Sequence, residues 1–108
     1  MTGNPLVFVR SSRRDLRGFP ARARREIGHD LFLVQLGVEP RDWRPMPSIG
    51  VGVREIRVHT EGEWRVIYIA TRPEAVFVLH AFAKRTRRTR PLDLAVARAR
   101  LAALRRPR

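Results

Sequence analysis

Three basic residues, Arg57, Arg65 and Lys84, have residue types and a spacing that suit chemistry on a phosphate group. A guanidinium stays charged at physiological pH and presents a planar set of donors to phosphate oxygens. Lys84 is the only lysine among the 23 basic residues of the chain. All three lie in or directly after segments whose apolar, β-branched residues predict consecutive strands, at 53–59, 64–70 and 76–83. The sequence therefore indicates phosphate chemistry that depends on cations held by a sheet.

The turn between the first two of these strands decides whether the two arginines face each other. In a three-residue loop that ends at Gly62, with glycine in the left-handed position, Arg57 lies directly opposite Arg65. That register also pairs apolar residues on the other face, Val58 with Trp64 and Ile56 with Val66. Two facing arginines repel each other, and an anion between them removes the penalty. We therefore expect both on one solvent-facing side, close enough to bind one phosphate, whereas a two-residue loop would separate them.

Lys84 is the candidate general base. Cleavage of RNA without a metal ion needs a deprotonated 2′-hydroxyl, a stabilised phosphorane and a protonated 5′-oxygen leaving group. Arg57 and Arg65 are suited to stabilising the charge of the phosphorane. Lysine is a poor base at its ordinary pKa of about 10.4, but the arginines that follow Lys84 favour its neutral form. The residues alone favour a surface lysine that only anchors phosphate, and it is the family resemblance given below that favours the base. Strict strand alternation leaves open whether Lys84 lies past the strand end or after a bulge.

Three further residues of these strands, Glu55, Tyr68 and His80, are alternative catalytic candidates. Glu55 is expected to act as a charge partner that orients Arg57 rather than as a general base. His80 lies in mid-strand, which favours a hydrogen-bonded core histidine over a proton donor. Tyr68 is expected to bury its ring and to keep its hydroxyl at the rim of the core, although a phenol can also stack on a nucleobase or donate a hydrogen bond.

The charge balance of the chain predicts a polyanionic partner. With 23 basic and 10 acidic residues, the net charge is +13. A dense basic cluster follows the last predicted strand and consists of Arg85, Arg87, Arg88 and Arg90. We expect this cluster to bind RNA through its phosphates, and a solvated basic tail is the alternative.

The residues that the chain lacks disfavour other kinds of site. There is no cysteine, which excludes disulfides and thiolate chemistry. His29 and His59 have no metal-ligand spacing with a carboxylate, so we expect neither a metal site nor another cofactor. No apolar run approaches the roughly 20 residues of a membrane span, and the N-terminus lacks a signal-peptide pattern, so the cytoplasm is the expected location.

The remaining segments predict a single α+β domain over residues 1–108. Residues 5–10 fit a first strand, a short helical turn follows to Leu16, and a longer helix runs from Pro20 to Gly37. The apolar stripe of that helix is Ala23, Ile27, Leu31 and Val34. Residues 38–52 contain three prolines and two glycines, which predicts a loop without regular structure. With a last helix at 91–104, the expected order is β-α-α-β-β-β-α, an antiparallel-rich sheet packed against a helical hairpin.

The strand segments resemble those of the RelE/HigB-like toxins of bacterial type II toxin–antitoxin modules, in the phage-derived HigB-like branch. That branch has a glycine-preceded E-(L/I)-R strand, an R-V-I-Y strand, an L-H-A-F strand that runs into two basic residues, and a proline that opens the last helix. The corresponding residues here are Gly52 with 55–57, then 65–68, then 79–82 with Lys84 and Arg85, and finally Pro91. The resemblance covers residues 5–105.

The resemblance implies a RelE-like fold and an mRNA endonuclease that acts in the ribosome and inhibits translation and growth. Its implied partners are mRNA, the ribosome and a neutralising helix-turn-helix antitoxin. In one departure from the pattern, Arg85 stands where the branch has a second lysine, which leaves Lys84 as the only lysine base. The alternative function is a non-catalytic module that binds RNA or DNA through the same basic surface. No RNP aromatic pair, GXXG loop or helix-turn-helix spacing supports that alternative.

Overall fold

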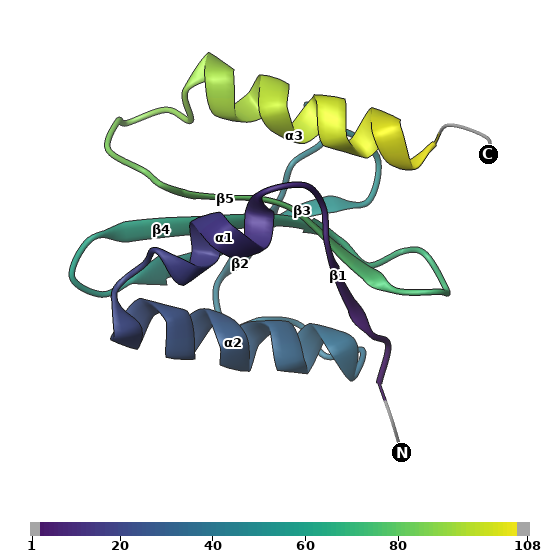
Figure 1. Ribbon diagram of the computed structural model, residues 1–108, viewed down its shortest axis with the longest axis horizontal. Helices are drawn as coiled ribbons and strands as arrows, with labels where there is room; N and C mark the ends of the chain where they lie inside the picture. Colours follow the sequence, from purple (N-terminus) through teal and green to yellow (C-terminus); the bar gives the residue numbers. More distant parts are fainter. Residues whose placement is uncertain (1–2, 106–108) are drawn as a thin grey trace.

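The computed structural model describes residues 3–105 and contains one mixed sheet with helices on both faces (Figure 1). In chain order the elements are β1 (Leu6–Phe8), α1 (Ser12–Arg17), α2 (Ala21–Gln35), β2 (Trp43–Pro45), β3 (Val53–His59), β4 (Glu63–Ile69), β5 (Val76–Ala83) and α3 (Pro91–Leu104). The strand order across the sheet is β1-β5-β4-β3-β2. Only β1 and β5 are parallel, so the expectation of an α+β fold with an antiparallel-rich sheet is confirmed.

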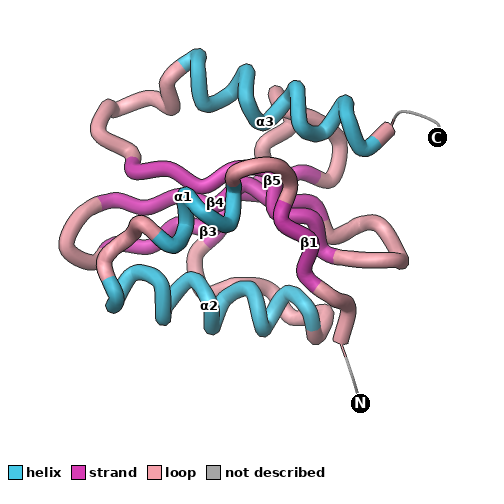
Figure 2. The backbone as a smooth tube through the Cα atoms, viewed as in Figure 1, coloured by secondary structure: helices cyan, strands magenta, loops and turns pink. Residues whose placement is uncertain are grey.

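The sheet separates two apolar cores (Figure 2). Helix α2, with Leu16 of α1 beside it, covers one face, which we call the α2 face. Helix α3 covers the opposite face, the α3 face, where Ala97 and Leu101 pack on strand residues such as Ile67. Because both faces are covered, successive residues of β4 are buried from Arg65 to Ile69 instead of alternating with exposed ones.

Helix α2 has the buried apolar stripe and the glycine C-terminal cap that its sequence predicts. The four stripe residues, Ala23, Ile27, Leu31 and Val34, are all buried. The helix ends in a Schellman motif, because Gly37 has a φ of 81° and donates to Val34 O, while Val38 donates to Leu33 O. Pro20 precedes the first helical residue instead of occupying it.

The prediction that residues 38–52 lack regular structure is wrong for β2. Trp43–Pro45 pairs antiparallel with β3, so the observed order is β-α-α-β-β-β-β-α. An edge strand pairs on one side only and therefore tolerates a proline. The guanidinium of Arg54 also lies over the Trp43 ring at 4.0 Å, which ties this edge to β3.

The predicted register of the β3–β4 hairpin is confirmed. Arg57 lies opposite Arg65, and Val58 lies opposite Trp64. Two residues of the connecting loop have positive φ angles, Glu61 at 54° and Gly62 at 137°. The latter value is in a region that favours glycine, and a Cβ there would lie 3.1 Å from the Trp64 ring.

A β-bulge in β5 determines which face of the sheet each residue in the C-terminal half of that strand packs on. Tyr68 pairs with Val78 and Ile67 pairs with His80, so Leu79 is the extra residue. A one-residue insertion exchanges the two faces for every residue that follows it. Val78 therefore packs in the core on the α2 face, whereas Phe82 packs in the core on the α3 face.

Replacement of Gly62 by valine should destabilise the hairpin and with it the register of Arg57 and Arg65. The positive φ and the contact with the Trp64 ring together should cost about 1–3 kcal/mol of unfolding free energy. Urea denaturation measures this, with Gly28→Ala as the control. A Cβ at Gly28 meets nothing within 4 Å and should not destabilise the helix. Equal stability of Gly62→Val and wild type would show that this glycine does not determine the turn.

Candidate active site

A basic hollow of about 420 Å³ opens on the α3 face of the sheet. Its walls come from β2, β3, the end of β5, the loop that follows β5 and the first turns of α3. The polar residues that line it are Arg44, Ser48, Glu55, Lys84, Arg87, Arg88 and Thr89. Four of these carry positive charge and one carries negative charge, so the hollow suits a polyanion.

Glu55 is the buried carboxylate of this hollow. The residue is 2% exposed, and its Oε1 lies 3.8 Å from Nε of Arg65. Its Oε2 is buried without a hydrogen-bond partner among residues 3–105. Burial raises the pKa of Glu55, and the nearby charges of Arg65, Lys84, Arg44 and Arg57 oppose that rise without cancelling it. The expected partner was Arg57, but the ion pair is formed with Arg65.

The structure corrects the expectation that both arginines are solvent-facing. Arg57 and Arg65 do share one side of the sheet, but Arg65 is only 2% exposed. Its Nη1 donates to Trp64 O and its Nη2 donates to Oε1 of Glu63, both at 3.0 Å. A charged residue can be buried when such partners replace water. Arg65 is therefore part of the structure beneath the hollow and is not peripheral to the core.

A chain of polar contacts links Arg65 to the surface. The ring nitrogens of His59 lie 2.7 Å from Oδ2 of Asp42 and 2.7 Å from Oε1 of Glu63, which also accepts from Arg65. Burial disfavours the charged form of Glu63, but hydrogen bonds from Arg65 and His59 outweigh it and lower the pKa of Glu63. The sequence prediction missed this chain, although the register that it predicted places His59 opposite Glu63.

The bulge at Leu79 brings Lys84 to the α3 face. Lys84 follows Phe82 in the exchanged register, is partly exposed and lines the hollow together with Glu55. Its backbone N–H donates to Glu63 O at 2.7 Å, which extends the strand pairing by one residue. Both positions left open by the sequence apply, because Lys84 follows the bulge and also lies just past the end of β5 at Ala83. It has a carboxylate neighbour in addition to its arginines.

His80 is a buried histidine that connects β5 to α3. Its Nε2 lies 2.8 Å from Oδ1 of Asp93, and Oδ2 of Asp93 accepts from Nε of Arg90 at 3.1 Å. The His80 ring also stacks on Phe82 with the centroids 5.0 Å apart. Arg90 thus has a carboxylate partner, unlike the expectation that it serves RNA alone. The sequence prediction missed Asp93, whose position three residues after Arg90 in the first turn of a helix was the available signal.

The other three arginines of the basic cluster, Arg85, Arg87 and Arg88, are exposed in the loop between β5 and α3. This loop passes beside the hollow, which Arg87 and Arg88 line. The structure therefore brings together Lys84, Glu55 and two arginines of the cluster.

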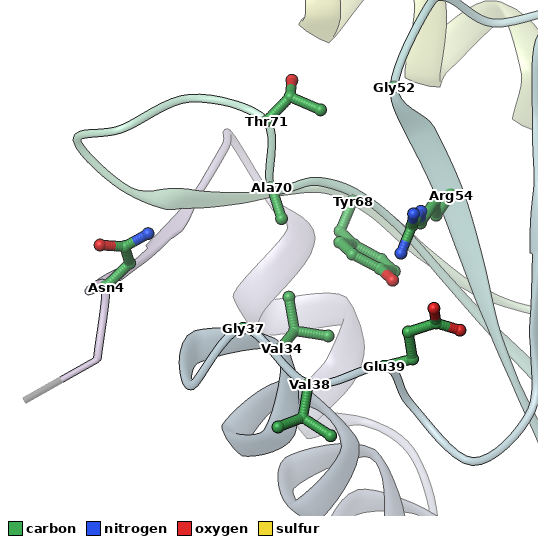
Figure 3. Close-up of a pocket in the computed structure, with 10 residues that line it drawn as sticks. All are labelled: Asn4, Val34, Gly37, Val38, Glu39, Gly52, Arg54, Tyr68, Ala70 and Thr71. Carbon is green, nitrogen blue, oxygen red and sulfur yellow. The ribbon is translucent and has the colours of Figure 1, made fainter.

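Tyr68 lies on the opposite face of the sheet, away from the hollow. It is 1% exposed, and its hydroxyl is buried without a hydrogen-bond partner among residues 3–105, so the hydroxyl is not at a rim as expected. Burial raises the pKa of Tyr68, and the guanidinium of Arg54 opposes the rise. Tyr68 lines a separate cavity of about 210 Å³. Figure 3 shows its side chain among the lining residues, with Val34 and Val38 at the end of α2. Tyr68 and Lys84 therefore belong to different faces.

Glu55→Gln should change how stability depends on pH. A carboxyl whose pKa is raised by folding binds its proton more tightly in the folded protein, so its contribution to stability falls as pH rises from the ordinary glutamate pKa through the raised one. The wild type should therefore gain stability relative to Glu55→Gln as pH is lowered from 7 toward about 4.3. Parallel urea titrations at several pH values test this. A stability difference that does not vary with pH would contradict a raised pKa.

Residues 3–105 contain neither a membrane-spanning helix nor a cluster of metal ligands. No helix in the part of the chain from 3 to 105 is long and apolar enough to cross a membrane. Within the same residues, no group of three or more histidine or acidic side chains is arranged to hold a metal ion.

Comparison with known proteins identifies a family but no individual relative. The family model of the phage-derived Gp49-like proteins (DUF891) matches residues 14–102, which include all of α2, most of α3 and all residues that line the hollow. A search of curated proteins found no match. The family is of the kind that supplies toxins of toxin–antitoxin systems. The chain therefore belongs to the phage-derived Gp49-like family.

Proposed function

We propose that this protein is the toxin of a type II toxin–antitoxin module and that it cleaves mRNA without a metal ion, in the ribosome. One observation carries the proposal. Oε2 of Glu55, which lines the basic hollow, and Nε of Arg57 and Arg65 on the same side of the sheet are buried without hydrogen-bond partners among residues 3–105. Buried polar atoms without hydrogen bonds are costly, and a phosphate with its ribose hydroxyl would supply the partners that these atoms lack.

The cations of the hollow would hold the scissile phosphate. Lys84 lines the hollow, is partly exposed and can reach a ligand. Arg57, on the same side of the sheet as Arg65, is also partly exposed but lines a separate pocket with Asp42 and His59, so it would contact a ligand that extends beyond the hollow. Arg65 acts from beneath through its charge. Fixed positive charges in a site with little water stabilise the extra negative charge of a pentavalent phosphorane. The hydrogen bonds of Arg65 with Trp64 O and Glu63 would keep its guanidinium in place during the reaction.

Two residues are candidates for the proton transfer from the 2′-hydroxyl. Lys84 is the base that the sequence indicates. Glu55 has a stronger physical case, because burial raises the pKa of its carboxyl, and a carboxylate with a raised pKa accepts a proton more readily than an ordinary one. In this assignment Lys84 supplies charge and a proton for the 5′-oxygen. The bond between phosphorus and the 5′-oxygen breaks as the 2′-oxygen attacks, which leaves a cyclic phosphate.

Family membership supports the biological setting of this proposal. The Gp49-like family is related to toxin–antitoxin systems, and a RelE-like topology would agree with a five-stranded, mostly antiparallel sheet. Cleavage of mRNA would occur in the cytoplasm, and a helix-turn-helix antitoxin would neutralise it. The net charge of +13 favours rRNA and mRNA as binding surfaces.

A non-catalytic RNA- or DNA-binding module is the second candidate, because the exposed arginines of the loop after β5 bind phosphate whether or not cleavage follows. Induced expression, with mapping of mRNA 5′ ends, separates the two functions. New 5′ ends that depend on Lys84 and Glu55 support the nuclease. Growth arrest or RNA binding with unchanged 5′ ends would favour the binder.

Arg57→Ala and Lys84→Ala should each reduce cleavage by about 10²–10³-fold, because each removes a charge that stabilises the transition state. The melting temperature should stay near that of wild type, since both side chains are partly exposed. Arg13→Ala, an exposed arginine of α1, is the matched control. Full activity of Lys84→Ala would remove lysine from the mechanism, and equal loss in the control would show a general charge effect.

Replacement of Arg85, Arg87 and Arg88 by glutamine should weaken RNA binding at all sequences alike. Each phosphate contact with single-stranded RNA contributes a slope of about −0.7 to the dependence of log affinity on log salt, so three lost contacts should flatten it by about 2. Arg90 is kept, because it pairs with Asp93. Binding titrations at several salt concentrations measure the slope. A change in cleaved codons at unchanged affinity would instead mean that the cluster reads bases.

A further inference from the structure

The outward side of α2 exposes large apolar side chains. Phe32 is 53% exposed, Leu36 is 39% exposed and Val38, just beyond the helix, is 52% exposed. Phe32 and Leu36 are four residues apart and therefore lie on one face of the helix. Figure 1 shows α2 as the outer layer on its side of the sheet, with no other element beyond it. Three exposed apolar side chains at one end of a helix are characteristic of an interaction surface.

Gly28 lies in the same outward stripe, one turn before Phe32. A glycine inside a helix costs about 1 kcal/mol relative to alanine. Nothing in the fold requires it, because a Cβ at Gly28 would meet no atom within 4 Å, and its φ is not positive. Its absence of a side chain does leave a flat place on the helix surface, where another helix can approach closely.

The other end of the stripe is basic. Arg24 and Arg25 are exposed one turn before Gly28, and neither forms an ion pair within residues 3–105. The outward side of α2 therefore changes along its length from cationic, through a flat glycine, to apolar. A complementary surface would carry acidic side chains at one end and apolar ones at the other.

The apolar end continues into the cavity of about 210 Å³ shown in Figure 3. Val38 belongs to both the exposed group and the cavity wall, where Val34 and Ala70 are its apolar neighbours and Asn4, Glu39, Arg54 and Thr71 are polar. Protein interfaces concentrate their binding energy where a side chain of one partner enters such a pocket.

We propose that this surface, from Arg24 and Arg25 through Gly28 to Phe32, Leu36 and Val38, docks an acidic amphipathic helix of the neutralising antitoxin, which crosses α2 at Gly28. The partner's identity rests on the proposed function, whereas the surface and its chemistry do not. RNA would match the arginines but not the exposed apolar residues. A second copy of this chain would bring another charge of +13 to the same place, which repels.

The test uses the full-length chain and the purified products of the reading frames that adjoin its gene. Phe32→Ser and Gly28→Gln should each weaken binding of the partner by at least about tenfold, the first through lost apolar contact and the second through a steric block. Gly28→Gln should not lower the melting temperature, because glutamine favours a helix more than glycine does. Arg24→Glu with Arg25→Glu should also weaken binding and reduce its dependence on salt. Leu92→Ser, at a 65% exposed leucine of α3, is the control and should bind normally.

Growth arrest and RNA cleavage by the same variants are measured separately, without the partner. Active variants that escape neutralisation support both proposals, and inactive variants that still show the binding losses support the docking surface alone. The docking proposal fails if neither neighbouring product binds the wild type, or if Phe32→Ser and Gly28→Gln bind as tightly as wild type. It also fails if light scattering shows a wild-type dimer that Phe32→Ser dissociates, or if Phe32 is needed instead for binding to vesicles with anionic lipids.

Discussion

The burial of Glu55 beside Arg65 is the constraint on which the α3 side of the molecule depends. A carboxylate in a protein interior is stable only where nearby charges and hydrogen bonds replace water. Here the closest cation is itself 2% exposed and is held by Trp64 O and Glu63. The pair is looser than a hydrogen-bonded one, because its nearest atoms are 3.8 Å apart. The outcome is a carboxyl whose pKa is raised by burial although four cations surround it, a state suited to receiving a proton.

A single inserted residue joins this buried pair to the basic loop. Without Leu79 as a bulge, regular alternation would place Lys84 on the same face as Val78, in the layer of α2. The bulge shifts the alternation of β5 by one residue, so that Val76 and Val78 pack under α2 before it, whereas Ala81 packs there after it and Phe82 packs under α3. His80 lies directly after the bulge, and its contact with Asp93 fixes the start of α3 against the sheet. The position of the loop from 84 to 90 is thus determined at both of its ends, by β5 and by Asp93.

Sequence reasoning succeeded where a feature depends on near neighbours in the chain. The stripe of α2 follows from helical periodicity, and the pairing of Arg57 with Arg65 follows from the glycine of the turn and the apolar pairs beside it. It failed where burial depends on distant segments. Nothing near Arg65 in the sequence reveals that α3 closes over its face, and an arginine is expected to be exposed unless its partners are known. The strand at Trp43–Pro45 was missed because the three prolines of residues 38–52 argued against strand pairing. The contact that supports this strand, between the Trp43 ring and Arg54, comes from another strand.

The hollow and the proposed docking surface lie on opposite faces of the sheet, so the antitoxin would not neutralise the protein by covering the hollow. A partner on the outward side of α2 would not cover the hollow, because the sheet lies between them. It would instead enlarge the molecule along the direction in which α2, the sheet and α3 are stacked, which lies across the shortest axis (Figure 1). A helix packed on another adds an interaxial distance of about 8–10 Å, before the rest of the partner is counted. Under the proposed function, such a partner would act by enlarging the protein that has to bind the ribosome, while the residues of the hollow stay in place.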